Sequence, residues 1–248
     1  MKSHPVRSAL AALSVLFAVN LSAKTEWTYT FDNLKAGDLL KQEDWKTYNP
    51  GLGVVELSPQ VTPATPPARG FVLAQQPFEG KATSRGRKIL PPLFDGRSEL
   101  VLEFDARATA ASSIAMFGIG ADPVFPATFG IMFDQFVVRR DTFGGEIHPA
   151  LDSSGKRVIA KRGDWYRVRS EWTRDDATGE WSATLAIRNL TKGESDFTPL
   201  TFDRSQNVSS VSLANEPVKT PKPLRVAVVR LGVPGGEIDN LSITSASR

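Results

Sequence analysis

The sequence contains no cysteine and only two histidines, His4 and His148. Without cysteine the protein has no disulfide, no thiolate metal site and no thiol nucleophile. Because His4 falls in the N-terminal segment described next, His148 is the one candidate base for a Ser-His-Asp triad, and a metal site built from several histidines is excluded. His148 lies in the loop-like stretch 144–149, where we expect no catalytic role.

Long apolar runs are absent except for one near the N-terminus. After Lys2 and Arg7, the run from Ala9 to Leu21 is shorter than the roughly 20 residues of a spanning helix, and it leads to Ser22 and Ala23. This order is typical of a secretory signal. We predict a cleaved signal peptide over residues 1–23 and a secreted or periplasmic product without a membrane span. An uncleaved anchor is the alternative, and N-terminal sequencing separates the two.

The mature chain also lacks a strong charge of either sign. Removal of Lys2 and Arg7 lowers Lys+Arg from 30 to 28 against 27 Asp+Glu, which leaves a net charge of +1. A nearly neutral domain gives no reason to expect nucleic acid or an anionic membrane as a partner. Residues 24–248 have the length of a single β-domain, since sandwiches of roughly 200–250 residues are often one domain.

A sustained helical period is missing after the signal, whereas two-residue alternation recurs. Leu100, Leu102 and Phe104 alternate with polar or smaller residues. Residues 165–189 form the clearest hairpin pattern, with a turn at 175–179 and with Trp172 and Trp181 on the inward positions. Further strands are expected at 27–31, 53–57, 71–74, 114–119, 129–133, 136–140, 224–231 and 238–244.

The pattern predicts an all-β fold with nine or more strands and little helix. Two antiparallel sheets packed face to face, as in a jelly roll, bury the apolar faces of so many short strands. The proline-rich stretch 59–67 has few ladder donors, so we expect an exposed, extended loop there.

Three short motifs resemble bacterial exported domains of the concanavalin A-like lectin/glucanase superfamily, including laminin-G-like modules. They are YTFDNL at 29–34, GDWYRV at 163–168 and GEIDNL at 236–241. The resemblance implies a two-sheet jelly roll whose terminal strands pair and which binds glycans on a sheet or at a loop edge. The Glu-x-Asp-x-x-Glu strand of the glucanase members is absent, so that type of glycoside hydrolase is disfavoured.

Two aspartates occur in parallel contexts, Asp32 in FDNL and Asp239 in IDNL. If the first and last strands are neighbours, these carboxylates and nearby carbonyl oxygens form a possible structural calcium site, because calcium prefers hard oxygen ligands. The alternative is that the Asp-Asn pairs only turn the chain through side-chain hydrogen bonds.

Candidate ligand-binding residues are aromatic or basic. Trp45 and Tyr48 lie in a polar loop, where a ring can cover the apolar face of a sugar. The alternative for Trp45 is that it packs beneath the sandwich edge. Arg139 and Arg140 can hydrogen-bond an acidic sugar or form a solvated strand end. These features favour an exported, non-enzymatic sandwich that binds carbohydrate or another surface polymer. A polysaccharide hydrolase or lyase, and a structural or adhesion module of the envelope, are the alternatives.

Overall fold

The computed structural model describes residues 25–46, 56–57, 60–63, 71–74, 83–92, 97–121, 124–140, 146–203, 205, 208–213, 225–232 and 235–245. The elements in chain order are β1 (Thr25–Tyr29), β2 (Gly37–Asp38), the 3-10 helix η1 (Leu39–Lys41), β3 (Glu56–Leu57), β4 (Gln60–Pro63), β5 (Phe71–Ala74), β6 (Thr83–Ile89), β7 (Glu99–Arg107), β8 (Ile114–Ala121), β9 (Val124–Met132), β10 (Gln135–Arg140), β11 (Ile147–Pro149), β12 (Trp165–Arg174), β13 (Trp181–Asn189), β14 (Thr198–Leu200), β15 (Ser210–Leu213), β16 (Val226–Gly232) and β17 (Glu237–Ser245). Over these ranges, no helix is long and apolar enough to cross a bilayer.

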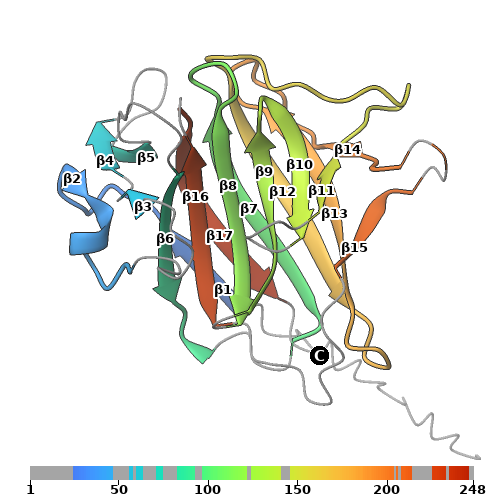
Figure 1. The fold of residues 1–248 in the computed structure, drawn as a ribbon, viewed down its shortest axis with the longest axis horizontal. Coiled ribbons are helices and arrows are strands. Elements are labelled where there is room, and N and C mark those ends of the chain that lie inside the picture. Colours follow the sequence, from blue (N-terminus) through green and yellow to red (C-terminus); the bar gives the residue numbers. More distant parts are fainter. Residues whose placement is uncertain are drawn as a thin grey trace, which may run out of the picture.

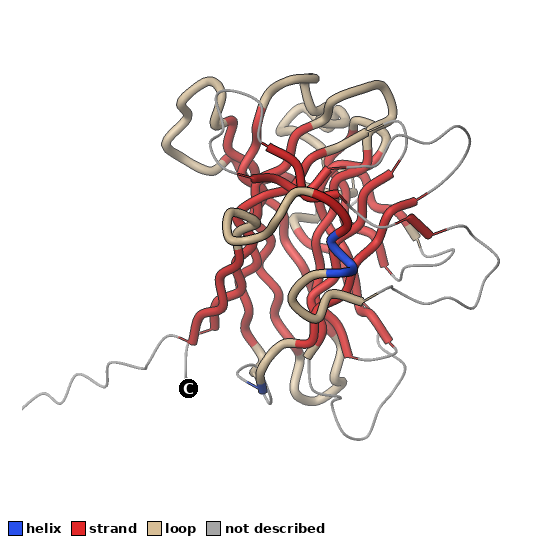
Figure 2. Tube along the Cα trace, turned by 90° about the vertical axis from the view of Figure 1, so that its left-hand side faces the viewer, coloured by secondary structure: helices blue, strands red, loops and turns tan. Residues whose placement is uncertain are grey.

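The strands form two sheets (Figures 1 and 2). The ten-stranded sheet has the order β14-β13-β12-β7-β17-β5-β4-β2, with β1 paired to β17 and β15 paired to β13. The seven-stranded sheet, which faces the viewer in Figure 1, has the order β11-β10-β9-β8-β16-β6-β3. All pairs are antiparallel except β3 with β6. The expected all-β sandwich is therefore confirmed.

The hydrophobic core lies between the two sheets. Phe104 of β7 packs against Phe117 of β8 and Phe129 of β9, with ring centroids 5.8 and 5.3 Å away. Trp172 and Trp181, predicted as inward residues of the long hairpin, are 1% and 4% exposed and meet edge to face. One set of alternating side chains from each sheet fills this space. The other set lies on the outer faces, where the candidate sites are found.

The terminal strands pair as the sequence predicted, with Thr25 opposite Ser245 and Tyr29 opposite Leu241. The expectation for the proline-rich stretch was wrong in part, because β4 pairs with both β2 and β5 and its Val61 is 1% exposed. The reason is that Gln60, Val61 and Thr62 keep their N–H groups, and the proline of this strand stands at its last position.

Candidate functional site

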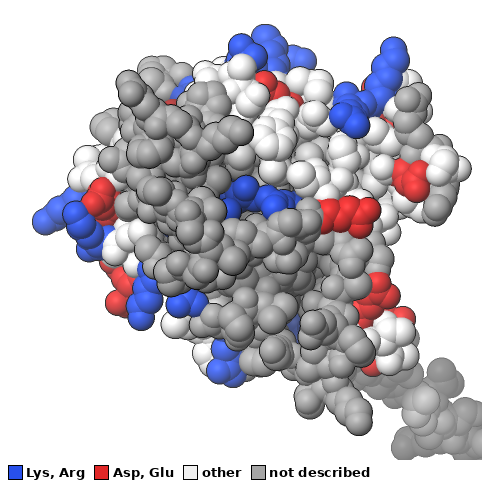
Figure 3. All heavy atoms as spheres, viewed as in Figure 1, with Lys and Arg blue, Asp and Glu red and all other residues white. Residues whose placement is uncertain are grey.

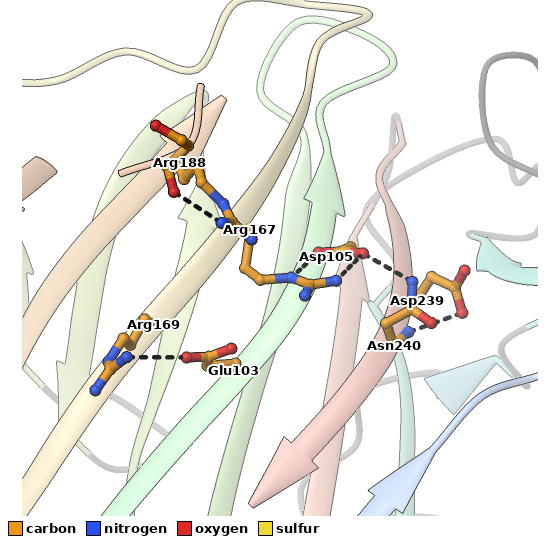
Figure 4. Close-up of polar contacts among 8 residues, drawn as sticks. Glu103, Asp105, Arg167, Arg169, Arg188, Asp239 and Asn240 are labelled. Carbon is orange, nitrogen blue, oxygen red and sulfur yellow. Dashed lines mark hydrogen bonds and ion pairs between the residues drawn. The ribbon is translucent and has the colours of Figure 1, made fainter. Parts of the chain in front are cut away.

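A row of charged side chains crosses the outer face of the ten-stranded sheet. Arg188 on β13, Arg167 on β12, Asp105 on β7 and Asp239 on β17 are successive Cα partners along one line of the sheet. Their neighbours along the strands point into the core, so alternation turns these four outwards. Figure 4 shows them in this order. We call them the charged row.

Asp105 accepts hydrogen bonds from side chains on both neighbouring strands, β12 and β17. Its Oδ1 accepts a hydrogen bond from Arg167 Nε at 2.7 Å, and its Oδ2 accepts one from Arg167 Nη2 at 2.8 Å. Asn240, which has a φ of 50° at the bulge in β17, donates from Nδ2 to the same Oδ2 at 2.7 Å. Hydrogen bonding to Asp105 raises the pKa of Arg167. These charge-assisted bonds hold β12, β7 and β17 in register.

Asp239 has an unusual protonation behaviour for an aspartate. Burial raises the pKa of its carboxyl group from 3.8 to about 7, and the negative charges of Asp105 and Asp32 add to the rise. The Asn240 N–H donates a hydrogen bond to Asp239 Oδ1 at 2.8 Å, and this bond lowers the pKa of Asp239. A carboxyl group with this pKa exchanges a proton near neutral pH, which is a property of catalytic acids as well as of buried structural aspartates.

The two predicted calcium ligands lie near one another in the fold. β1 and β17 are neighbours, and the charge of Asp32 contributes to the pKa of Asp239. Asp32 lies in the turn after β1, where its Oδ1 accepts a hydrogen bond from the Phe71 N–H at 2.8 Å. Among the residues that the structure describes, no three His, Cys, Asp or Glu side chains are grouped to hold a metal ion. A calcium ion here needs backbone or water oxygens to complete its shell.

Calcium binding by Asp32 and Asp239 stays a prediction, which melting curves test. An ion that binds only the native state is expected to raise the melting temperature by about 5–10 °C at a concentration near 100 times its Kd. Asp32→Asn should abolish this shift because it removes one anionic ligand. A melting temperature that is the same in calcium and in chelator contradicts the site.

Trp45 does not have the exposed ring face that stacking on a sugar requires. Trp45 is 2% exposed and packs beside Phe31 and Tyr29, and its indole N–H donates to the Tyr29 hydroxyl at 3.0 Å. The ring therefore lies beneath the sandwich edge, the alternative that the sequence left open, and presents no free face to a ligand. Tyr48 lies outside the described residues.

A second candidate site, which contains the basic candidate Arg139, lies on the outer face of the seven-stranded sheet. Arg139 of β10 is 8% exposed on this face, and the side chain of Arg140 lies outside the described part of the chain. Arg85, Arg87 and Arg230 join Arg139 on the same face. Sequence analysis missed these three. The one local signal was the spacing of Arg85 and Arg87, because residues two apart in a strand point the same way.

These four arginines, which we call the arginine face, occupy two neighbouring lines across the sheet. In the first, Arg85 of β6 is the Cα partner of Arg230 of β16. The second line begins at Arg87 of β6, whose Cα partner is Val228 of β16. It continues through β8 and β9 and ends at Arg139 of β10. Arg85 and Arg230 are 4% and 7% exposed. Figure 3, viewed from the same side as Figure 1, shows basic side chains at the middle of this face.

The floor between the arginines consists of small or apolar residues. Gly118 and Thr128 are Cα partners in the second line, and Met116 follows Arg230 in the first. Gly118 is required by the close approach of β8 to β9, because a Cβ atom there would lie 2.3 Å from the Ala127 carbonyl oxygen. The floor of the arginine face is therefore made of closely packed strands, with arginines toward both of its sides.

Substitution of Gly118 tests whether the close approach of β8 to β9 requires glycine at this position. Gly118→Ala is expected to lower the free energy of unfolding by about 1–3 kcal/mol, because the added methyl group forces β8 and β9 apart. Urea denaturation measures the loss. Ser182→Ala, on the outer face of the other sheet, is the control and should change stability by less than about 0.5 kcal/mol. Equal stability of Gly118→Ala and the unchanged protein would show that the strands relax without cost.

His148 is separated from the arginine face by the pleat of the sheet. Its Cα partner is Val138, which points into the core, whereas Arg139 is opposite Ile147. The His148 Nε2 atom lies 3.6 Å from a carboxylate oxygen of Glu146. Because successive side chains point to opposite faces, His148 and Arg139 leave the sheet on different sides. A histidine-arginine pair of the kind that a lyase would use is not formed by these two residues.

Comparisons with known proteins return solved structures only. No family model and no curated protein matches the chain. A carbohydrate esterase from bacteriophage phi24B is 11% identical with a TM-score of 0.48, covering 91% of this chain and all of its own (100%). A GH16 endo-β-1,3(4)-glucanase is 10% identical with a TM-score of 0.48, covering 90% and 91%, respectively. A seed lectin of Lotus tetragonolobus is 11% identical with a TM-score of 0.42, covering 71% and 88%.

These similarities concern the fold alone and assign no site to this chain. The class of protein is accordingly defined by its own two sheets, a β-sandwich as the sequence predicted.

Proposed function

We propose that this chain is an exported, non-enzymatic β-sandwich that binds carbohydrate through the outer face of its seven-stranded sheet. The observation that carries the proposal is the arginine face, where arginines from β6, β16 and β10 lie on one face of the sheet. A sheet face offers a long surface, and an extended polymer can follow it across several strands.

The predicted signal peptide supports the same proposal. A signal peptide over residues 1–23 would direct export of the domain to the periplasm or the exterior, where polysaccharides are available as ligands. The absence of a recognised catalytic motif in the sequence favours binding over catalysis.

A glycan-array screen of the mature protein, residues 24–248, tests the proposed function. We expect retention of a subset of glycans without cleavage. The screen should be run in calcium and in chelator, and polymer length should be followed at the same time. Binding without shortening supports the proposal, cleavage of the bound polymer refutes the non-enzymatic part, and the absence of binding to any glycan refutes the whole.

A polysaccharide-acting enzyme is the second candidate, and one observation favours it. Asp239, with a pKa near 7, lies opposite Asp105 on the neighbouring strand. A carboxyl group whose pKa lies near neutrality can act as a general acid. If cleavage is seen, Asp239→Asn should abolish it while leaving binding intact. Cleavage that survives in Asp239→Asn would exclude this residue as the acid.

A further inference from the structure

Two exposed apolar side chains lie on neighbouring segments at one end of the seven-stranded sheet. Phe133 is in the two-residue loop that joins β9 to β10, because Met132 and Gln135 are Cα partners. Ile159 is the Cα partner of Gln135 on the other side of β10. Phe133 is 52% exposed and Ile159 is 56% exposed. Each of these two residues therefore leaves about half of its surface outside the core.

The backbone of the β9–β10 loop is unfavourable for a phenylalanine. Phe133 has a φ of 53° and Asp134 has a φ of 61°. Two positive φ values are the pattern of a type I′ turn, which favours asparagine and glycine at these positions. The Asp134 carboxylate holds the loop, since it accepts hydrogen bonds from the Ser112 and Ser113 N–H groups at 3.0 Å each. A bulky residue that is both strained and exposed points to a role outside the fold.

A positively charged segment borders the two apolar side chains. Residues 156–162 read KRVIAKR, with four cations and no acid. The Ala160 N–H donates to the Asp134 carbonyl oxygen at 2.8 Å, so the segment runs beside the β9–β10 loop. Val158 and Ala160 pack against the core. The side chains that alternation turns outward are all exposed: Arg157, Ile159 and Lys161. We call residues 156–162 the basic segment.

The cations of the basic segment are held only weakly by acids of the fold. Lys161 is 73% exposed and lies 3.6 Å from Asp164, and Arg162 is 59% exposed and lies 3.6 Å from Asp134. These two carboxylates are only 8% and 17% exposed. Near the other end of the segment, Asp152 uses its Oδ1 for hydrogen bonds within its own turn. Exposed pairs of this kind contribute little, so the positive charge stays available at the surface.

We propose that this end of the sandwich attaches the protein to an anionic lipid surface. Phe133 and Ile159 insert among the lipids, and the cations of the basic segment contact the phosphates. Apolar side chains leave water at a bilayer interface, and each Lys or Arg near an anionic surface adds attraction. A sugar platform would instead need free polar groups beside the ring, whereas the carboxylate of Asp134 is already bonded. This attachment goes beyond the proposed carbohydrate binding and does not depend on it.

Cosedimentation of residues 24–248 with lipid vesicles tests the inference. This form contains every described strand and lacks the apolar run of the predicted signal, which would bind lipid by itself. The probes are vesicles of equal parts phosphatidylglycerol and phosphatidylcholine, and vesicles of phosphatidylcholine alone. We expect binding to the mixed vesicles to be tighter by about tenfold or more, since the cations contribute only with the anionic lipid. Added salt should weaken this binding.

Phe133→Asn separates attachment from stability. Asparagine suits a positive φ, so the urea midpoint of unfolding should be unchanged or higher. Affinity for the mixed vesicles should nevertheless fall about tenfold, because the inserted ring is lost. Ile89→Asn is the matched control, since Ile89 is 61% exposed at the end of β6, which β16, β8 and β9 separate from β10. This control should bind vesicles as the unchanged protein does.

A double charge variant tests the basic segment. Lys161→Gln combined with Arg162→Gln should weaken binding to the mixed vesicles by about fivefold for each charge removed. Binding to phosphatidylcholine alone should not change. Lys35→Gln combined with Lys41→Gln is the control, because it removes two exposed cations beside β2, the last strand of the other sheet. It should bind as the unchanged protein does.

Other results overturn the inference in distinguishable ways. Equal binding to the two kinds of vesicle, or equal weakening by the two double variants, excludes a specific anionic contact. Absence of vesicle binding overturns the attachment and leaves carbohydrate binding intact. If Phe133→Asn instead dissociates a dimer or loses glycans on the array, the surface belongs to a protein contact or to the sugar site. Unchanged vesicle binding in Phe133→Asn overturns the proposal, and if that variant does not fold, unchanged binding in Ile159→Asn does so.

Discussion

Arg167→Met is expected to lower the free energy of unfolding by about 1–3 kcal/mol at pH 8, because it leaves the carboxylate of Asp105, which is 7% exposed, without its charged partner. The change removes both hydrogen bonds to Asp105 and leaves the carboxylates of Asp105 and Asp239 on adjacent strands without a guanidinium. Urea denaturation measures the loss. At pH 5 the loss should be smaller, because Asp239 then carries a proton and the repulsion falls.

Arg169→Met is the matched control for this experiment. Arg169 lies two residues further along β12 on the same face and contacts Glu103 and Glu171, whose side chains are 24% and 53% exposed, against 7% for Asp105. Pairs with partly exposed carboxylates contribute about 0–1 kcal/mol, so the same replacement should cost less here. Similar losses in the two variants would mean that the arginine stem, rather than the ion pair, stabilises β12.

Asp239→Asn is expected to make the protein more stable at pH 8 and to leave stability nearly unchanged at pH 4. The folded-state pKa of Asp239 is about 7, against an ordinary value of 3.8. Between these two values the native protein binds a proton that the unfolded chain has released, so the contribution of Asp239 to stability falls as pH rises. Each pKa unit corresponds to about 1.4 kcal/mol, which sets the gain at pH 8 at about 2–4 kcal/mol.

The measurement is a series of urea denaturation curves between pH 4 and pH 9 for both proteins. Asp152→Asn is the control, because the Ser154 hydroxyl bond lowers the pKa of Asp152 below 3.8 in the native state, so Asp152 stays ionised above that pH in both states. The stability difference between this variant and the unchanged protein should therefore be nearly constant between about pH 5 and pH 9. If the stability difference between Asp239→Asn and the unchanged protein is constant over this pH range, Asp239 does not titrate near neutrality.

Local sequence patterns predicted the strands and much of the core. Two-residue alternation is a property of each strand by itself, so the hairpin of β12 and β13 and the inward positions of Trp172 and Trp181 were available without the fold. β4 was missed because its strand pattern is only four residues long and ends in proline.

The sites were harder to predict because they depend on which distant strands become neighbours. Arg85 and Arg230 are opposite one another, although they are far apart in the sequence. The same holds for Asp105 and Asp239, whose pairing adds to the rise in the pKa of Asp239 that burial causes. Arg139 was found by its residue type alone, and nothing in its flanking sequence indicates three further arginines on the same sheet.

The pairing of β1 with β17 has a consequence for how the chain folds. Every residue of β1 has its Cα partner in β17, and β17 in turn separates β7 from β5 in the ten-stranded sheet. That sheet cannot close until the last strand is available, so a ribosome-bound chain holds its first strand without a partner for most of its synthesis. Contacts of such large sequence separation slow folding. Closing of the ten-stranded sheet is therefore expected to be a slow, late step of folding.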